Sequence, residues 1–575
     1  MEDGFVSIRD AISATELDRH LRAITAEVRL SGSPEEARAF DYIEAHLEGW
    51  GYAVHRYQSE ALIGYPRSAS LHVLGDDPVE LRANGYSLSP GTGPAGVTGE
   101  LVYVGAGMPA DYAGIEARDK IVLSDGLAMP GKARAASLAG ARGQIHINDD
   151  QIHEMCLSPV WGTPTPETAP LLPDVPAVGV RREDGALLKA RLAEGPVTVR
   201  LVTEPYRAWT TIPTLTADLP GVDETRFVLF SGHVDSWHLG VMDNGTANAT
   251  QLEVARLLAE RKDELRRGVR LAFWSGHSHG RYASSAWYAD SHWHELHERC
   301  VCHVNIDSVG AKGATILEEA PTMAETYGFG RQIIAEVTGA ALDYRRISRS
   351  SDQSFWGHGI PTLFATLSEQ PRDDSPTGAA MAQLLGAGGK SGGLGWWWHT
   401  PEDTRDKIDP AHLVRDAQVY AETLWRLCTL PRLPFDYAAT ADELAETLAR
   451  DHDAARGRLD LERTRQLALA LGRELRSGAL DRLDDERVNA VLIELGHRLI
   501  PVNYTCAGPF AHDLALGTTP LPGLADALTL GQLAADSDEL RFLRTRLERE
   551  RNRVEHALRG ALRLVQAHAE MNGEP

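Results

Sequence analysis

The sequence is poor in cysteine, in long apolar runs and in positive charge. Five cysteines in 575 residues are too few and too scattered for a disulfide framework, so buried, reduced thiols are expected. No stretch of about 18 uncharged apolar residues occurs, which predicts no membrane-spanning helix. Lys plus Arg number 58 against 81 Asp plus Glu, a formal net charge of −23. That acidic surplus argues against nucleic acid or an anionic membrane as a partner.

The first residues, MEDGFVSIRD, lack the apolar run of a signal peptide, which predicts a cytoplasmic protein. Hydrophobic residues make up 43% of the chain and charged residues 24%, a balance that excludes a disordered or fibrous chain. At roughly 100–200 residues per domain, the length predicts several domains.

The pattern of apolar residues divides the chain into three parts. Residues 1–60 and 206–435 alternate helical and strand patterns, which predicts one discontinuous α/β domain with a largely parallel central sheet flanked by helices. Residues 61–205 carry short β-rich runs separated by Gly, Pro and Asp, which predicts a compact β-rich insertion. Residues 436–575 repeat Leu, Ala and charged residues at helical spacing, which predicts a helical C-terminal domain.

Histidines and carboxylates follow several predicted strands of the α/β part at the point where each strand ends. In open α/β sheets functional groups gather at this edge, and imidazole with carboxylate is a ligand set for Zn²⁺ and related divalent ions. Each residue alone is weak evidence, but an ordered series is much less expected by chance. The series comprises His233, Asp235, Asp243, His277, His279, Asp307 and His399.

The motifs around these residues make the chain resemble the co-catalytic zinc aminopeptidase family, in its glutamate carboxypeptidase II and transferrin receptor branch. Residues 61–205 resemble a protease-associated domain, and the helical tail loosely resembles the dimerisation domain of that branch. The segments that carry the resemblance in the α/β part are GHVDSW (232–237), DNGTA (243–247), NID (305–307), SDQSFWGHGIP (351–361) and HTPED (399–403).

This resemblance implies a site with one or two divalent ions, zinc being the first choice. Asp243 would bridge two metal positions, His233 and Asp307 would complete one, and His399 would belong to the other. Asp235 would take part in catalysis by orienting a ligand histidine. The resemblance also implies a homodimer formed through the C-terminal helical domain.

The chain departs from the family at the two positions that carry its catalytic Glu-Glu pair. His277 stands at the position of the general base and Ser278 at that of a metal ligand. His277 could act as the base, because an unperturbed imidazole titrates near neutrality, or it could bind metal itself. His279 could replace the missing ligand. A one-metal site and an inactive binding protein, as the transferrin receptor is, stay open as alternatives.

The sequence therefore predicts a metal-dependent hydrolase that acts on an amide or peptide-like bond of a small molecule or short peptide. A lyase or cyclase on the same fold is the alternative reaction, because the changed base also suits proton abstraction next to a carbonyl. Trp398, Asp352 and Arg349 are predicted to line the substrate pocket, the tryptophan as an aromatic wall and the arginine as a partner for a substrate carboxylate.

Overall fold

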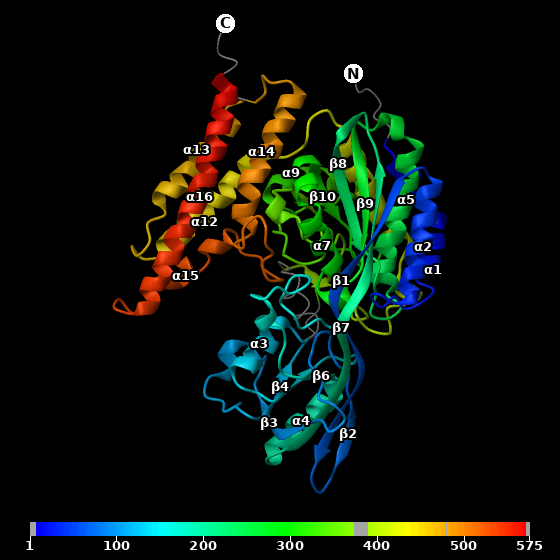
Figure 1. The fold of residues 1–575 in the computed structure, drawn as a ribbon, viewed down its shortest axis with the longest axis vertical. Helices are drawn as coiled ribbons and strands as arrows, with labels where there is room; N and C mark the ends of the chain where they lie inside the picture. The colour runs from blue at the N-terminus through cyan, green and yellow to red at the C-terminus, as the bar shows by residue number, and fades with distance from the viewer. Residues whose placement is uncertain (1–6, 373–388, 479, 571–575) are drawn as a thin grey trace.

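The computed structural model describes residues 7–372, 389–478 and 480–570. Within these ranges, eleven strands form one mixed sheet in the order β11-β10-β8-β9-β7-β3-β4-β5-β6, with β1 paired to β7 and β2 to β1 (Figure 1). The strands are β1 (Ala53–Leu74), β2 (Val79–Arg82), β3 (Val97–Tyr103), β4 (Ile121–Asp125), β5 (Gly143–Ile147), β6 (Ala177–Val180), β7 (Thr198–Leu219), β8 (Asp223–His233), β9 (Arg267–Trp274), β10 (Cys300–Asn305) and β11 (Thr362–Leu363).

The strands β8, β9, β10 and β11 are parallel to one another and form the centre of the predicted α/β domain, whereas β9 is antiparallel to its other neighbour, β7. All eight residues of β9 are buried, as expected for a parallel strand covered on both faces. Val228 and Phe230 of β8 pack into the large core that includes helix α5 (Ala247–Glu260). Phe227 and Leu229 point the other way, toward α7 (Ala283–Ser291). This alternation gives a helix–sheet–helix sandwich.

Two N-terminal helices, α1 (Ala14–Ile24) and α2 (Pro34–Gly49), lie beside α5 on one side of this sandwich (Figure 1). In α1 the hydroxyl of Ser13 caps the first turn by accepting the amide of Glu16, which satisfies a donor that would otherwise be unpaired. In α2 Ser33 caps in the same way by accepting the amide of Glu36, and Pro34 occupies the first turn, where its missing N–H costs no hydrogen bond.

The predicted insertion is joined to the α/β part through β1 and β7, which pair over their whole length. Both strands run straight through the predicted limits at residues 60 and 205, and only the register shifts, between Tyr65 and Ser68. The lower strands β3 to β6 enclose a separate apolar core with α4 (Arg182–Glu194). This part also contains the short helix α3 (Pro130–Leu138). The three-part domain division stays a prediction.

The C-terminal region is helical, as predicted, and lies on one side of the α/β part (Figure 1). Its helices are α12 (Tyr437–Ala454), α13 (Glu462–Arg476), α14 (Asp485–Tyr504), α15 (Ala527–Leu530) and α16 (Asp538–Glu570). Across the described ranges, we find no helix that combines the length and apolar character needed to cross a bilayer.

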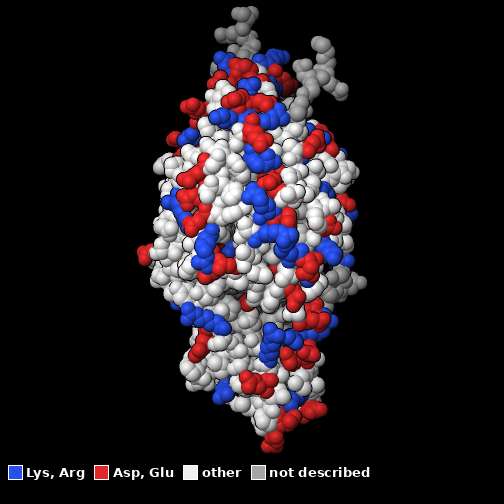
Figure 2. Space-filling view, turned by 90° about the vertical axis from the view of Figure 1, so that its right-hand side faces the viewer, with Lys and Arg blue, Asp and Glu red and all other residues white. Residues whose placement is uncertain are grey.

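Two expectations drawn from composition, the acidic surplus and the buried reduced thiols, can be compared with the structure. Acidic and basic residues are interspersed on the face seen in Figure 2, so the acidic surplus does not gather there into a single patch. Four cysteines are buried and unpaired, as predicted, but Cys506 is exposed beside the carboxylate of Asp513.

The core holds histidines whose burial makes folding sensitive to acid. Burial lowers the pKa of His303, in β10, from 6.5 to about 3. Because the folded pKa lies below the unfolded one, the unfolded state binds more protons as pH falls below 6.5, and stability is lost there. We expect His303→Gln to shrink the loss of unfolding free energy between pH 7.5 and pH 5.5 by about 1 kcal/mol, measured by urea titration. The exposed His294→Gln should leave that difference unchanged.

Candidate metal centre and active site

The carboxyl ends of three adjacent parallel strands deliver the central side chains of the site. His233 is the last residue of β8, Asp307 follows β10, and His277 opens the short helix α6 (His277–Gly280) just after β9. Asp243 lies at a kink in the segment Val241–Thr246, where its backbone is not helical (φ −108°, ψ 90°). His399, a residue in left-handed conformation (φ 59°), comes from a distant loop. Non-glycine residues in that conformation are strained, and such strain is common at functional sites.

Asp243 lies between two histidines, with one carboxylate oxygen facing each. Its Oδ1 is 3.0 Å from Nε2 of His233, and its Oδ2 is 2.9 Å from Nε2 of His399. Asp307 places Oδ1 3.7 Å from the same His233 nitrogen, and the hydroxyl groups of Ser308 and Ser351 donate to its two oxygens. The structure thus brings together the four residues that the family resemblance assigned to metal.

The other ring nitrogen of each histidine is fixed by an acceptor. Nδ1 of His233 donates to the backbone carbonyl of Asp235 (2.9 Å), Nδ1 of His399 donates to the carbonyl of Glu154 (2.6 Å), and Nδ1 of His277 donates to the carboxylate of Asp352 (2.6 Å). In a neutral imidazole whose Nδ1 carries the proton, Nε2 presents a lone pair. The lone pairs of His233 and His399 therefore face carboxylate oxygens of Asp243.

Two lone pairs at about 3 Å repel unless a positive charge lies between them, so this arrangement fits a bound cation. His233 Nε2 and Asp243 Oδ1 are buried and have no hydrogen-bond partner of acceptable geometry. Burial would lower the pKa of His233, but Asp235, Asp243 and Asp307 outweigh it and hold that pKa well above its usual value, so a proton takes the place of the cation when no metal is bound. Burial would raise the pKa of Asp243, yet His233 and His399 hold it well below. The donors match the ligand preference of zinc.

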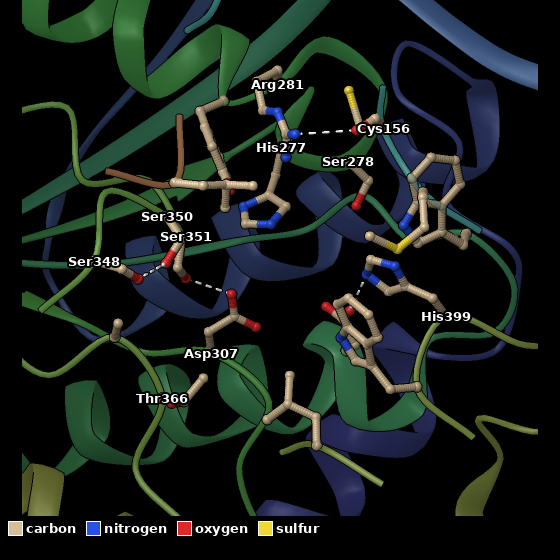
Figure 3. Close-up of a pocket in the computed structure, with 18 of the residues that line it drawn as sticks. Cys156, His277, Ser278, Arg281, Asp307, Ser348, Ser350, Ser351, Thr366 and His399 are labelled. Atoms are coloured by element: carbon tan, nitrogen blue, oxygen red, sulfur yellow. Dashed lines mark hydrogen bonds and ion pairs between the residues drawn. The ribbon is translucent and has the colours of Figure 1, made fainter. Parts of the chain in front are cut away.

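His277 joins this group of donors. One ligand atom each from His233, His277 and Asp307 lie within 4.8 Å of one another, and the His277 ring stacks on that of His233 at 3.7 Å between centroids. In Figure 3, Ser278 lies between His277 and His399, across from Asp307. The Ser278 hydroxyl is buried and has no hydrogen-bond partner. Where the family carries its Glu-Glu pair, this chain therefore presents the imidazole of His277 and the small hydroxyl of Ser278 to the metal donors.

His279 lies elsewhere, which corrects its expected place among the ligands. It is fully buried behind Asp235, and its Nδ1 contacts the hydroxyl (2.7 Å) and accepts the amide (3.2 Å) of Ser31. Burial lowers the pKa of His279 to about 4. His277, two residues earlier in the chain, faces the metal donors instead.

Asp235 orients the site through a different group from the one expected. The sequence predicted that its carboxylate would hold a ligand histidine, but its backbone carbonyl binds His233, whereas the carboxylate Oδ1 is 3.7 Å from that ring nitrogen. The carboxylate instead accepts the backbone amides of His277 (3.1 Å) and Ser278 (3.0 Å). Asp235 thus fixes the turn that replaces the Glu-Glu segment.

A cavity of about 80 Å³ opens on the metal donors. Trp398 lines it as predicted, together with Trp237 and Tyr282, and two arginines, Arg281 and Arg345, reach its wall. The paired guanidinium of Arg345 contacts the buried carboxylate of Glu369 (2.7 Å). The substrate-binding role of Trp398 stays a prediction.

Two residues predicted for the pocket lie outside it. Asp352 sits behind His277, where its carboxylate holds the ring instead of meeting a substrate. Arg349 donates to the Asp513 carbonyl and lies over the Trp161 ring at 4.4 Å, so its charge is directed away from the metal donors. Their proximity in sequence to the SDQSF motif does not decide which way each side chain points.

Some positioning groups had little or no signal in the sequence. Asp403 accepts the amides of Met242 (2.9 Å) and Asp243 (3.0 Å); the HTPED motif marked its position but not this role. Burial raises the pKa of Asp403 to about 7. The carbonyl of Glu154, which orients His399, comes from the predicted insertion, 245 residues away, and no local pattern marks it.

A buried histidine–carboxylate centre at the carboxyl edge of an α/β sheet is typical of metal-dependent enzymes, and the similarities to known proteins give the class as peptidase-like hydrolases. More narrowly, residues 214–424 match the model of peptidase family M28 and residues 97–188 match that of the PA domain. These matches support the co-catalytic zinc peptidase family that the sequence motifs indicated, and the segment matched by the PA domain precedes the segment matched by the peptidase family.

Several known proteins are similar to this chain. The probable glutamate carboxypeptidase VP8 of Zea mays is 24% identical over 495 residues, spanning 74% of this chain and 68% of that protein. Carboxypeptidase Q of Bos taurus is 24% identical over 281 residues, 46% of this chain but only 58% of that protein. The aminopeptidase of Aneurinibacillus sp. strain AM-1 shares the fold, with a TM-score of 0.54 and 23% identity over 74% of this chain and 96% of that one.

Proposed function

We propose that the chain hydrolyses an amide or peptide-like bond of a small substrate at a metal centre rebuilt around His277. The observation that carries this proposal is the set of anchored imidazoles, whose Nδ1 atoms are hydrogen-bonded to acceptors while the Nε2 atoms of His233 and His399 face carboxylates. Similarity to carboxypeptidases and an aminopeptidase supports hydrolysis over the lyase, cyclase and binding-protein alternatives.

One metal position is well supplied with donors and the other is not. His233, His277 and Asp307 would hold an ion together with Asp243, and zinc suits this mixture of imidazole and carboxylate. The second position would have His399 and the other Asp243 oxygen, with Ser278 in place of the family's glutamate. We therefore favour a single divalent ion. When bound, it would supply Lewis acidity and lower the pKa of a coordinated water.

The protein's own residues position the substrate and exclude solvent. Trp237, Trp398 and Tyr282 form an aromatic wall that keeps water away from the reacting bond. The unpartnered hydroxyl of Ser278 faces the same space and is free to donate to a substrate oxygen. A positioned base typically contributes about 10²–10⁴-fold, so without the family's glutamate we expect slow turnover of simple peptides.

His277→Ala tests whether this residue is a ligand. We expect the variant to lose zinc affinity by more than about 100-fold, because a direct ligand matters more than an outer partner, whose loss costs about 10–100-fold. Zinc affinity is measured by competition with a chelating dye, and turnover is followed on a peptide panel. In His279→Ala zinc binding should persist. Retained zinc with lost turnover in His277→Ala would make His277 a base, and absence of zinc from the wild type would refute the metalloenzyme.

A further part of the proposal concerns assembly. A homodimer through the C-terminal helices is supported by the exposed Phe542 on α16, 74% accessible. The net charge of −23 supports a partner other than nucleic acid.

A further inference from the structure

A continuous chain of hydrogen bonds runs behind His277, on the side away from the cavity. The carboxylate of Asp352 accepts from His277 Nδ1 (2.6 Å) and from the hydroxyl of Ser285 (2.7 Å). The Ser285 oxygen lies 3.0 Å from the Ser354 hydroxyl, and Ser354 accepts the indole N–H of Trp161 at 2.8 Å. The chain connects the predicted insertion to the metal centre.

The ends of this chain indicate the direction of its bonds, and the Ser285 hydroxyl lies closer to Asp352 (2.7 Å) than to its other acceptor, the carbonyl of Tyr282 (3.2 Å). An indole N–H can only donate and a carboxylate can only accept, so each serine must accept from one side and donate toward Asp352. Hydrogen bonds aligned in one direction polarise one another. The result strengthens the hold of Asp352 on the Nδ1–H of His277.

The surroundings keep this arrangement in place. Asp352, Ser285, Ser354 and Trp161 are each at most 4% exposed, so water does not compete for their bonds. Asp352 has a left-handed backbone (φ 59°), a conformation that non-glycine residues avoid and that persists only where the surrounding structure enforces it. The strained backbone at Asp352 places its carboxylate at hydrogen-bond distance from Nδ1 of His277.

We propose that Asp352, Ser285, Ser354 and Trp161 form a positioning relay that fixes the tautomer and ring plane of His277, so that Nε2 meets the metal together with His233 and Asp307. This inference rests on the proposed function. Asp352 is a positioning residue, not a ligand, and Trp161 makes the insertion part of the metal centre. Loss of a link should weaken the metal site in proportion to its closeness to His277.

The protein contains a matched pair for comparison. Ser368 donates to the carboxylate of Asp416 at 2.6 Å, and both residues are buried, but their bonds lead to Gly310 and Arg415 instead of a metal donor. Asp416→Asn and Ser368→Ala therefore remove the same chemistry at another place. They control for the general cost of disturbing a buried aspartate–serine pair.

The test is Co²⁺ and Zn²⁺ binding to the full chain, followed by dye competition and by the visible spectrum of the Co²⁺ form. An asparagine amide at 352 can donate to Nδ1 and so allow the tautomer that lacks the Nε2 lone pair. We expect Asp352→Asn to weaken binding by about 10–100-fold and to shift the Co²⁺ absorption bands. Ser285→Ala should weaken binding less, and Trp161→Phe least, while both control variants match the wild type.

The outcomes separate the relay from the function on which it rests. If the wild type binds metal and Asp352→Asn binds it with the same affinity and spectrum as Asp416→Asn, the relay is refuted while the proposed function stands. If Asp352→Asn fails to fold, Ser285→Ala against Ser368→Ala decides by the same measurements. If the wild type binds neither ion, the proposed function fails and the relay fails with it.

Discussion

Replacing Asp243 with alanine is expected to abolish metal binding and to lower kcat/KM by at least about 10³-fold, about 4 kcal/mol of transition-state stabilisation. The reason is geometric, because the two oxygens of this one carboxylate face His233 at 3.0 Å and His399 at 2.9 Å. Both metal positions therefore lose a donor at once. Zinc content by elemental analysis and turnover on the peptide panel measure the effect.

The matched control is Asp451→Ala, which removes another buried aspartate, paired with Arg450 in the C-terminal helices. That variant should keep its zinc. An Asp243→Ala protein that retained one zinc per chain would show that His233, His277 and Asp307 hold the ion without a bridging carboxylate, which would contradict the assignment of Asp243.

Replacing Arg29 with alanine is expected to destabilise the protein by more than about 3 kcal/mol, since breaking a buried charged hydrogen-bond network typically costs about 3–5 kcal/mol. Arg29 is fully buried. Burial lowers the pKa of its guanidinium to about 10, which leaves it charged at neutral pH. The carbonyls that accept its hydrogen bonds belong to Val234, Ile24, Glu27, Leu239 and Gly240.

The free energy of unfolding from urea titration measures this loss, and Arg38→Ala provides the comparison. Arg38 forms ion pairs with Glu27 and Glu35, but its side chain is 53% exposed. Exposed pairs contribute about 0–1 kcal/mol. If Arg29→Ala and Arg38→Ala proved equally stable, the hydrogen bonds of Arg29 to the carbonyls of residues 234–240 would not be what stabilises that segment.

The elements of the fold were largely predictable because local patterns specify them. The alternating helical and strand patterns of residues 206–435 indicated the parallel sheet and its helices, and the helical spacing of residues 436–575 indicated the C-terminal helices. The residues at which the insertion begins and ends could not be predicted in this way. At residues 60 and 205 both strands simply continue with a register shift nearby, and no composition change marks a place where a strand passes from one core to another.

The ordered ligand series was also predictable, because parallel strands bring their carboxyl ends to one edge of the sheet. His233, Asp243, Asp307 and His399 meet there. The choice between His277 and His279 was not predictable, since it depends on how the turn after β9 is held by Asp235. Side-chain direction in such a turn follows from backbone angles that distant contacts impose.

By itself, the sequence determined the fold class, the residue types at the strand ends and the absence of the family's Glu-Glu pair. Only the tertiary structure decided that His277 faces the metal donors, that Asp352 stands behind it, and that a carbonyl of the predicted insertion orients His399. The physical reason is distance along the chain. These contacts join residues 75 and 245 positions apart, whereas periodicity and motif spacing report only on neighbours within one helix, strand or turn.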